Sequence, residues 1–111
     1  MIKILTVFVL LTASLQSYGQ SAESYSKNGT SKAEKGDYTG AIADFTKAIE
    51  LNLNYFSAYY NRGIVKYEIK DYSGALSDFT KAIELNPKYT DAYYNRGLAK
   101  DDLKEYRSAI A

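Results

Sequence analysis

The sequence predicts an all-α fold in which antiparallel helix pairs stack side by side as an α-solenoid. Three observations support this prediction. The segment 22–55 recurs as 56–89 and begins again at Thr90, each time with an offset of 34 residues. Apolar side chains within the copies follow the 3.6-residue period of helices, and capping or helix-ending residues separate the helical stretches. A fixed period of this length is typical of stacked repeats, which shelter their apolar faces on one another.

The first nineteen residues differ from the repeats and are predicted to be a secretory signal peptide. Lys3 gives a basic start, and residues 4–15 form an almost uninterrupted apolar run. Ser17 and Gly19 supply the small residues that precede a cleavage site between Gly19 and Gln20. We therefore expect an exported protein that is periplasmic, envelope-associated or secreted.

The apolar run of the leader is shorter than the roughly twenty residues that span a bilayer. We therefore expect no stable membrane span after cleavage. A buried core helix is the remaining alternative for this segment.

The second half of each repeat has the pattern of an amphipathic helix. Its apolar positions are spaced i, i+4, i+7 and i+8, which places them on one face. They are Ala41, Phe45, Ala48 and Ile49 in the first copy, and Ala75, Phe79, Ala82 and Ile83 in the second. Asp37 and Asp71 precede these runs, where a short acidic side chain caps free N–H groups. Asn86 ends the second run because the residue before a proline is disfavoured in a helix.

The first half of each repeat is also predicted to be helical, although it carries a glycine at the same phase in Gly29, Gly63 and Gly97. A helical glycine costs about 1 kcal/mol relative to alanine, so three in register indicate the close approach of a partner helix. Ala41, Ala75 and Ala109 supply a small residue twelve positions later. The predicted repeat core consists of Tyr25, Gly29, Ala41, Phe45, Ala48, Tyr59, Gly63, Ala75, Phe79, Ala82, Pro87, Tyr93 and Gly97.

The composition excludes several functional classes. The chain has no His and no Cys, so it cannot build a Ser/His/Asp triad, a Cys/His pair or a thiolate zinc site. We expect no enzyme activity, no catalytic residue, no metal site and no cofactor. Removal of the leader takes away Lys3 and leaves thirteen basic and thirteen acidic side chains. A neutral chain without a basic patch is not expected to bind nucleic acid.

The repeat resembles the tetratricopeptide repeat (TPR) family, in which an aromatic residue, Gly, Tyr, Ala, Phe, Ala and Pro follow in this order over 34 residues. The second copy presents them as Tyr59, Gly63, Tyr67, Ala75, Phe79, Ala82 and Pro87. The resemblance divides the chain into a first unit (22–55), a second unit (56–89) and a third unit (90–111) that stops one turn into its second helix. It implies a right-handed superhelix whose first helices line a concave groove for an extended peptide or a partner helix.

The resemblance also implies which residues line this groove. In the first unit they are Glu23, Ser26, Thr30, Ala33 and Glu34. The candidate binding residues lie in the other two units and are Tyr60, Asn61, Ile64, Tyr67 and Glu68, then Tyr94, Asn95, Leu98, Asp101 and Asp102, with Ser57 and Asp91 beside them. They form a Tyr-rich acidic surface suited to a Lys/Arg-bearing protein segment or peptide. The alternative is a solvated face whose tyrosines pack between repeats.

Some family members hold the C-terminal carboxylate of a peptide with a clamp of Lys, Asn and Arg. Of the residues at these positions only Asn61 matches, and Ser26, Thr30, Asp91 and Asn95 stand at the others. An acidic wall repels a carboxylate ligand, so this class of partner is not expected.

Arg62 and Arg96 stand where the family has a buried leucine. We expect each to pair with Asp44 or Asp78, because a buried charge must be compensated. A role in holding a ligand is the alternative.

The third unit lacks most of its second helix, which leaves apolar side chains without a partner. The alternatives are a piece of a longer chain, self-association through the C-terminal end, or a frayed tail. The expected function is an exported, non-catalytic module that binds a protein or peptide. The alternative is a structural assembly piece that stacks through its uncapped end.

Overall fold

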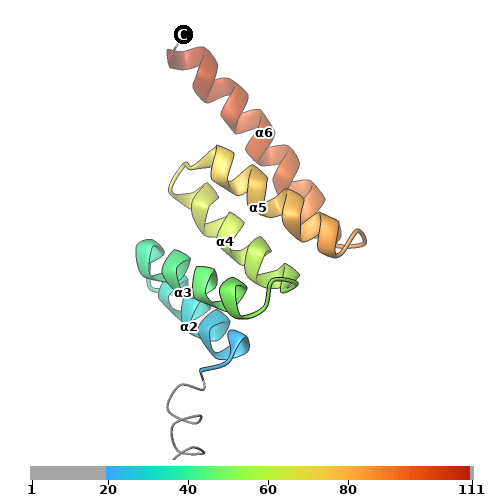
Figure 1. Cartoon of the computed structure of the whole chain (residues 1–111). Coiled ribbons are helices and arrows are strands. Elements are labelled where there is room, and N and C mark those ends of the chain that lie inside the picture. Colours follow the sequence, from blue (N-terminus) through green and yellow to red (C-terminus); the bar gives the residue numbers. More distant parts are fainter. Residues whose placement is uncertain (1–19, 111) are drawn as a thin grey trace, which may run out of the picture.

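The computed structural model describes residues 20–110, and the predicted signal peptide lies outside them. Five helices follow one another: α2 (Ala22–Glu34), α3 (Tyr38–Leu51), α4 (Phe56–Glu68), α5 (Tyr72–Leu85) and α6 (Thr90–Ile110) (Figure 1). Residues 20–110 contain no strand, so the predicted all-α fold is confirmed. Within the same range, no helix combines the length and apolar character that a membrane span requires.

The helices form two antiparallel pairs and a longer last helix. α2 packs on α3 and α4 packs on α5, while contacts of α3 with α4 and of α5 with α6 join the successive layers. Figure 1 shows these layers stacked one on the next, with α6 extending beyond the end of α5. The chain therefore has the stacked arrangement that its period predicts.

The predicted caps are present at the starts of α3 and α5. The Asp37 carboxylate accepts a hydrogen bond from the Gly40 N–H at 3.0 Å, and Asp71 accepts the equivalent bond from Gly74 at 3.0 Å. The turn before each cap contains one residue with left-handed backbone geometry, Gly36 (φ 82°) or Lys70 (φ 66°). This turn reverses the chain, so that the second helix of a pair folds back along the first.

The centre of each pair is a phenylalanine that lies against a glycine. Phe45 and Phe79 are 1% and 0% exposed. A Cβ atom added to Gly29 would lie 2.9 Å from Phe45 Cε1, and one added to Gly63 would lie 2.8 Å from Phe79 Cε1. The glycines therefore make room for the phenylalanine rings rather than for the alanines that the sequence suggested.

The third unit differs from the prediction, because α6 continues without a break where a second helix was expected to begin. Glu105 stands where Asp37 and Asp71 provide the caps, and a glutamate is a weaker N-cap than an aspartate. Ser108 replaces the glycine whose N–H those aspartates bind. The capping contact that begins the second helix of the other two units is therefore missing.

The straight course of α6 leaves several expected core residues in solvent. Tyr93 is 43% exposed, and a Cβ atom on Gly97 would have no atom within 4 Å. Ala109 is also exposed, and Pro87 lies exposed in the loop before α6. The prediction that Tyr93 and Gly97 are core residues is therefore wrong, since no second helix within residues 20–110 covers α6. It is wrong for Pro87 because this residue lies in the exposed loop between α5 and α6.

We expect alanine substitutions at two equivalent glycines to have opposite effects on stability. In Gly63→Ala the new methyl group meets the fully buried Phe79 ring, and such overpacking costs about 1–3 kcal/mol. In Gly97→Ala the methyl group enters open space, so the better helix propensity of alanine raises stability by up to about 1 kcal/mol. Urea unfolding followed by circular dichroism measures both changes, and a shift of both midpoints in the same direction would contradict this account.

Candidate binding surface

The predicted groove residues project from the first helices of the three units. α4 lies between α2 and α6 and contacts both. These three helices form one continuous side of the stack. We refer to it as the concave surface, after the groove that the sequence analysis expects on these helices.

Tyr60 and Tyr67 of α4 lie in the contact between α4 and α6 rather than free in the groove. Tyr60, Ile64 and Tyr67 are spaced i, i+4 and i+7, and they pack, half-buried, against a cluster that contains Phe79 and Ala99. The ring centroids of Tyr60 and Phe79 are 5.8 Å apart. The alternative of inter-repeat packing therefore describes the tyrosines of α4.

Two hydrogen bonds join α6 to the side of α4 that carries Tyr60 and Tyr67. Asn95 Nδ2 donates to Tyr60 Oη at 2.8 Å, and the Tyr67 hydroxyl donates to the Asp102 carboxylate. The bond to Asp102, assisted by burial, raises the pKa of Tyr67 to about 12. Burial likewise raises the pKa of Tyr60 above its usual value. Both phenols are therefore neutral at physiological pH. Their hydrogen bonds hold α4 and α6 in register.

The remaining candidate residues are accessible. Glu68, Tyr94, Leu98 and Asp101 are exposed, and Tyr94 is the most open of the aromatic residues here at 68%. Asn61, seven residues before Glu68 on α4, is half-buried. A ligand on the concave surface would meet these five side chains.

Two carboxylates of the concave surface sit at helix ends. Glu34 is the last residue of α2 and Glu68 is the last residue of α4. The C-terminal end of a helix carries a partial negative charge, which disfavours a carboxylate at that point. Each glutamate therefore adds to the negative potential that the end of its own helix already produces. A cation bound at either position would reduce this negative potential.

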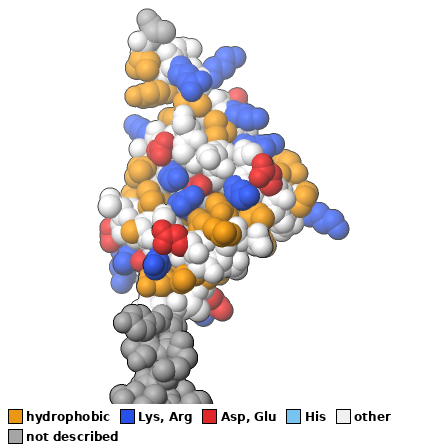
Figure 2. All heavy atoms as spheres, viewed as in Figure 1, with side chains coloured by type: hydrophobic (Ala, Val, Ile, Leu, Met, Phe, Trp, Pro, Cys, Tyr) orange, Lys and Arg blue, Asp and Glu red, His pale blue; other side chains and the backbone are white. Residues whose placement is uncertain are grey.

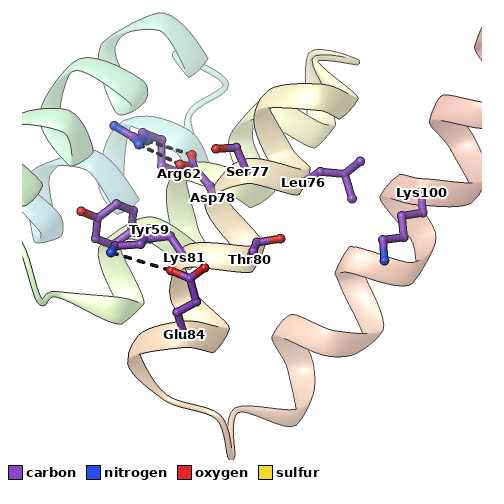
Figure 3. A pocket seen from close by; sticks show the side chains of 9 residues that line it. All are labelled: Tyr59, Arg62, Leu76, Ser77, Asp78, Thr80, Lys81, Glu84 and Lys100. Carbon is purple, nitrogen blue, oxygen red and sulfur yellow. Dashed lines mark hydrogen bonds and ion pairs between the residues drawn. The ribbon is translucent and has the colours of Figure 1, made fainter.

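Arg62 forms the expected structural ion pair. Its Nε and Nη2 atoms donate to Asp78 Oδ2 and Oδ1 at 2.8 and 2.7 Å, as the dashed lines in Figure 3 show. Arg62 Nη1 also donates to Thr46 Oγ1 at 3.1 Å, which ties the second unit to the first. The hydrogen bond with Asp78 raises the pKa of Arg62 above its already high value. Asp44 pairs instead with Lys32, whose Nζ is 2.8 Å from Asp44 Oδ2.

Arg96 does not form the expected ion pair. Within residues 20–110 no carboxylate oxygen lies within 4.0 Å of its guanidinium. Its Cζ atom instead lies 5.5 Å from the centre of the Tyr93 ring. The prediction is wrong at this position because no second helix brings an acid to α6.

The sequence analysis missed a separation of charge around α6. With about 100° per residue, all four basic side chains of this helix fall within an arc of about 80°. They are Arg96, Lys100, Lys104 and Arg107, whereas the acids Asp91, Asp101, Asp102 and Glu105 point to the other side. A helical projection of residues 90–110 as one helix would have found this pattern, which the expected break in the third unit concealed.

The basic side of α6 borders two adjoining hollows that share Leu76 and Lys100. The first has a volume of about 640 Å³ and is lined mainly by α5, with Arg62, Asp78 and Thr80 on its wall (Figure 3). The second, of about 520 Å³, is lined by Leu76, Lys100, Leu103, Lys104, Arg107 and Ser108. Figure 2 shows Lys and Arg side chains gathered around the C-terminal end of α6 on the face in view.

Comparison with known families and structures extends this description. A TPR-repeat model matches residues 29–70, and two tetratricopeptide-repeat models match residues 56–89 and 79–111. No curated protein sequence matches the chain significantly.

Several solved structures are similar to the chain. The first TPR of Spaghetti (RPAP3), bound to the HSP90 peptide SRMEEVD, is 30% identical, and the match covers 81% of this chain and 73% of that one with a TM-score of 0.73. MamA is 30% identical over 89% of this chain and 58% of its own, with a TM-score of 0.76. The TPR2B-domain:pHsp70 complex of yeast Sti1 is 29% identical over 80% and 71%, with a TM-score of 0.73.

We expect the Arg62 ion pair to contribute to stability and the equivalent Arg96 side chain not to. Arg62→Ala leaves the 3%-exposed Asp78 with only Lys66 nearby, at 3.2 Å, and should destabilise the fold by about 2 kcal/mol or more. Arg96→Ala should change stability by less than about 0.5 kcal/mol. Thermal unfolding of both variants measures the difference, and equal losses would refute the assignment.

We expect the Tyr67 hydroxyl to lose its proton at a higher pH than an ordinary tyrosine, because it is hydrogen-bonded to Asp102. Since the pKa of Tyr67 rises from 10.0 to about 12 on folding, the stability from this bond is complete below pH 10 and is lost as pH rises through about 12. The Asp102→Asn substitution should lower the pKa of the Tyr67 hydroxyl back toward its usual value. Ultraviolet titration of this variant measures the shift. The Tyr67→Phe protein identifies the signal, and an unchanged midpoint in Asp102→Asn would disprove the coupling.

Proposed function

Since the chain belongs to the tetratricopeptide repeat family, we propose that it is a non-catalytic module that binds a protein segment or extended peptide on its concave surface. Relatives of the same fold support this proposal, because the first TPR of Spaghetti (RPAP3) was solved with an HSP90 peptide. The exposed side chains Tyr94 and Leu98 lie one turn apart on α6 and offer an apolar contact.

The observation that supports a basic ligand is the placement of the carboxylates. Glu34 and Glu68 end their helices, and exposed Asp101 continues the acidic surface onto α6. These groups attract cations and repel an acidic C-terminal peptide such as SRMEEVD, whose carboxylates would meet Asp91 and Asp101. The proposed ligand is therefore an extended segment that bears Lys or Arg, whose aliphatic stems pack on Tyr94.

The proposed site of action is outside the cytoplasm. The support for it is the basic, apolar and small-residue pattern of residues 1–19, with cleavage between Gly19 and Gln20. A processed chain that begins at Gln20 would retain all five described helices.

A second candidate function is self-association through the end of α6. It is favoured by Tyr106 and Ile110, two apolar side chains near the C-terminal end of α6 that are 53% and 69% exposed. It is opposed by the basic side of α6, because two copies that pair through this side bring like charges together.

We expect a fluorescent Lys/Arg-bearing peptide of about eight residues to bind the full chain, and a matched Asp/Glu peptide not to bind. The double variant Glu68→Gln, Asp101→Asn should weaken binding by about tenfold, since two exposed charge contacts supply of the order of 1.4 kcal/mol. Affinity should also fall as salt is added. Fluorescence anisotropy measures each change.

Glu84→Gln provides the matched control. Glu84 is an exposed acid on α5, with 62% of its side chain accessible, and it lies outside the concave surface. The Glu84→Gln substitution should leave the affinity for the Lys/Arg-bearing peptide unchanged. Equal binding of the acidic peptide, or an equal loss in the Glu84 variant, would exclude the concave surface as an acidic binding site.

A further inference from the structure

The contact between α4 and α6 contains a tyrosine that the contact between α2 and α4 lacks. The Tyr67 hydroxyl of α4 donates to the Asp102 carboxylate of α6. The Tyr67 ring packs edge-on against Tyr72, the first residue of α5, with the ring centroids 5.5 Å apart. Tyr67 thus lies in a place that is bounded by the next first helix and by the start of the second helix of its own unit.

The residues that bound this place recur 34 positions earlier, between α2 and α4. Tyr38 begins α3, and the Glu68 carboxylate takes on α4 the position that the aspartate has on α6. The residue at the position of the tyrosine, however, is Ala33. Ala33 and Tyr38 both pack, half-buried, against the cluster that contains Phe45 and Val65. The place is therefore present without the side chain that fills it in the next unit.

The two groups that would receive a tyrosine here are without a partner in the described part of the chain. Glu68 is exposed, and within residues 20–110 its carboxylate forms neither an ion pair nor a side-chain hydrogen bond. In the same range Tyr38 takes part in no ring–ring contact. Val65 stands where α6 has Ala99, but its additional methyl groups are smaller than a tyrosine ring.

We propose that Ala33, Tyr38 and Glu68 form the site at which the concave surface anchors a tyrosine of its ligand. The phenol ring of the ligand packs against Tyr38 beside the Ala33 methyl group, and its hydroxyl donates to the Glu68 carboxylate. We call these three residues the tyrosine site. The inference rests on the function proposed above, since the ligand is the same protein segment or extended peptide. The site lies within the first two units and does not involve the end of α6.

The chemistry of the tyrosine site favours tyrosine over the residues that resemble it in part. Phenylalanine supplies a ring but leaves Glu68 without a donor. Lysine supplies a donor but has no ring to pack edge-on against Tyr38. Tyrosine supplies both, and few of its bonds lose rotational freedom on binding. The chain itself uses tyrosine for these two contacts, at Tyr67.

The distance from the tyrosine site to α6 gives the spacing of the two recognised residues in the ligand. Packed helices lie about 8–10 Å apart, so a site between α2 and α4 lies about 12–15 Å from α6. An extended chain advances about 3.3 Å per residue. A ligand that also places Lys or Arg near Asp101 and Tyr94 therefore carries this residue about four positions from its tyrosine.

Three labelled peptides of about eight residues test the tyrosine site. They share one lysine, and the residue about four positions from it is Tyr, Phe or Ala. We expect the tyrosine peptide to bind the full chain about tenfold more tightly than the phenylalanine peptide, because only its hydroxyl bonds a carboxylate. The phenylalanine peptide should bind about threefold more tightly than the alanine peptide. Glu68→Ala should make the Tyr and Phe peptides equal, as fluorescence anisotropy can measure.

Ala33→Tyr places the same phenol in the site from within the chain. Its hydroxyl should donate to Glu68, so the melting temperature should rise by about 4 °C, and the tyrosine peptide should bind no better than the alanine peptide. Ser31→Tyr is the matched control, because two residues turn a helix by about 200° and this exposed position of α2 points away from Ala33. It should leave all three affinities unchanged.

The outcomes separate this inference from the proposed function. Equal affinities of the Tyr and Ala peptides for the natural chain would overturn the tyrosine site and leave the acidic concave surface in place. If none of the three lysine-bearing peptides binds, both proposals fail. A preference for tyrosine that survives Ala33→Tyr or Glu68→Ala would assign the contact to another part of the chain and would also overturn the inference.

Discussion

The fold depends on one contact, in which the phenylalanine of a second helix lies directly on the glycine of a first helix. Phe45 on Gly29 and Phe79 on Gly63 leave no space for a Cβ atom. This closeness brings the aspartate before each phenylalanine within reach of a basic side chain on the first helix. Helix pairing and the buried ion pairs therefore have one geometric origin.

The polar side chains fall into two groups with different consequences. Arg62 and Asp78 satisfy one another inside a complete pair, and Tyr67 and Asp102 join neighbouring first helices. On α6 the charged side chains are divided between two sides of the helix, acidic toward the concave surface and basic on the opposite side. One helix thus offers two surfaces of opposite charge, of which the acidic one belongs to the proposed binding surface.

Periodicity and caps predicted the helix pairs because these signals are local. The aspartates at positions 37 and 71, and the phenylalanines that follow them, lie where the sequence places them. The course of α6 was not predicted, because similarity to the earlier copies outweighed the loss of the cap at Glu105. The sequence does not decide whether Tyr60 and Tyr67 are exposed in the groove or packed between repeats. The register between adjacent first helices decides this, and it depends on contacts that a single repeat does not contain.

A double-mutant cycle between Gly63→Ala and Phe79→Leu tests the central contact most directly. If Gly63 is required to make room for the Phe79 ring, Gly63→Ala should destabilise the natural chain. In the Phe79→Leu background the same substitution should cost little stability, or should add stability, because the leucine is smaller. Chemical unfolding of the four proteins should then give a coupling free energy of about 1 kcal/mol or more. Additive effects would show that Gly63 is required for another reason and would contradict the account.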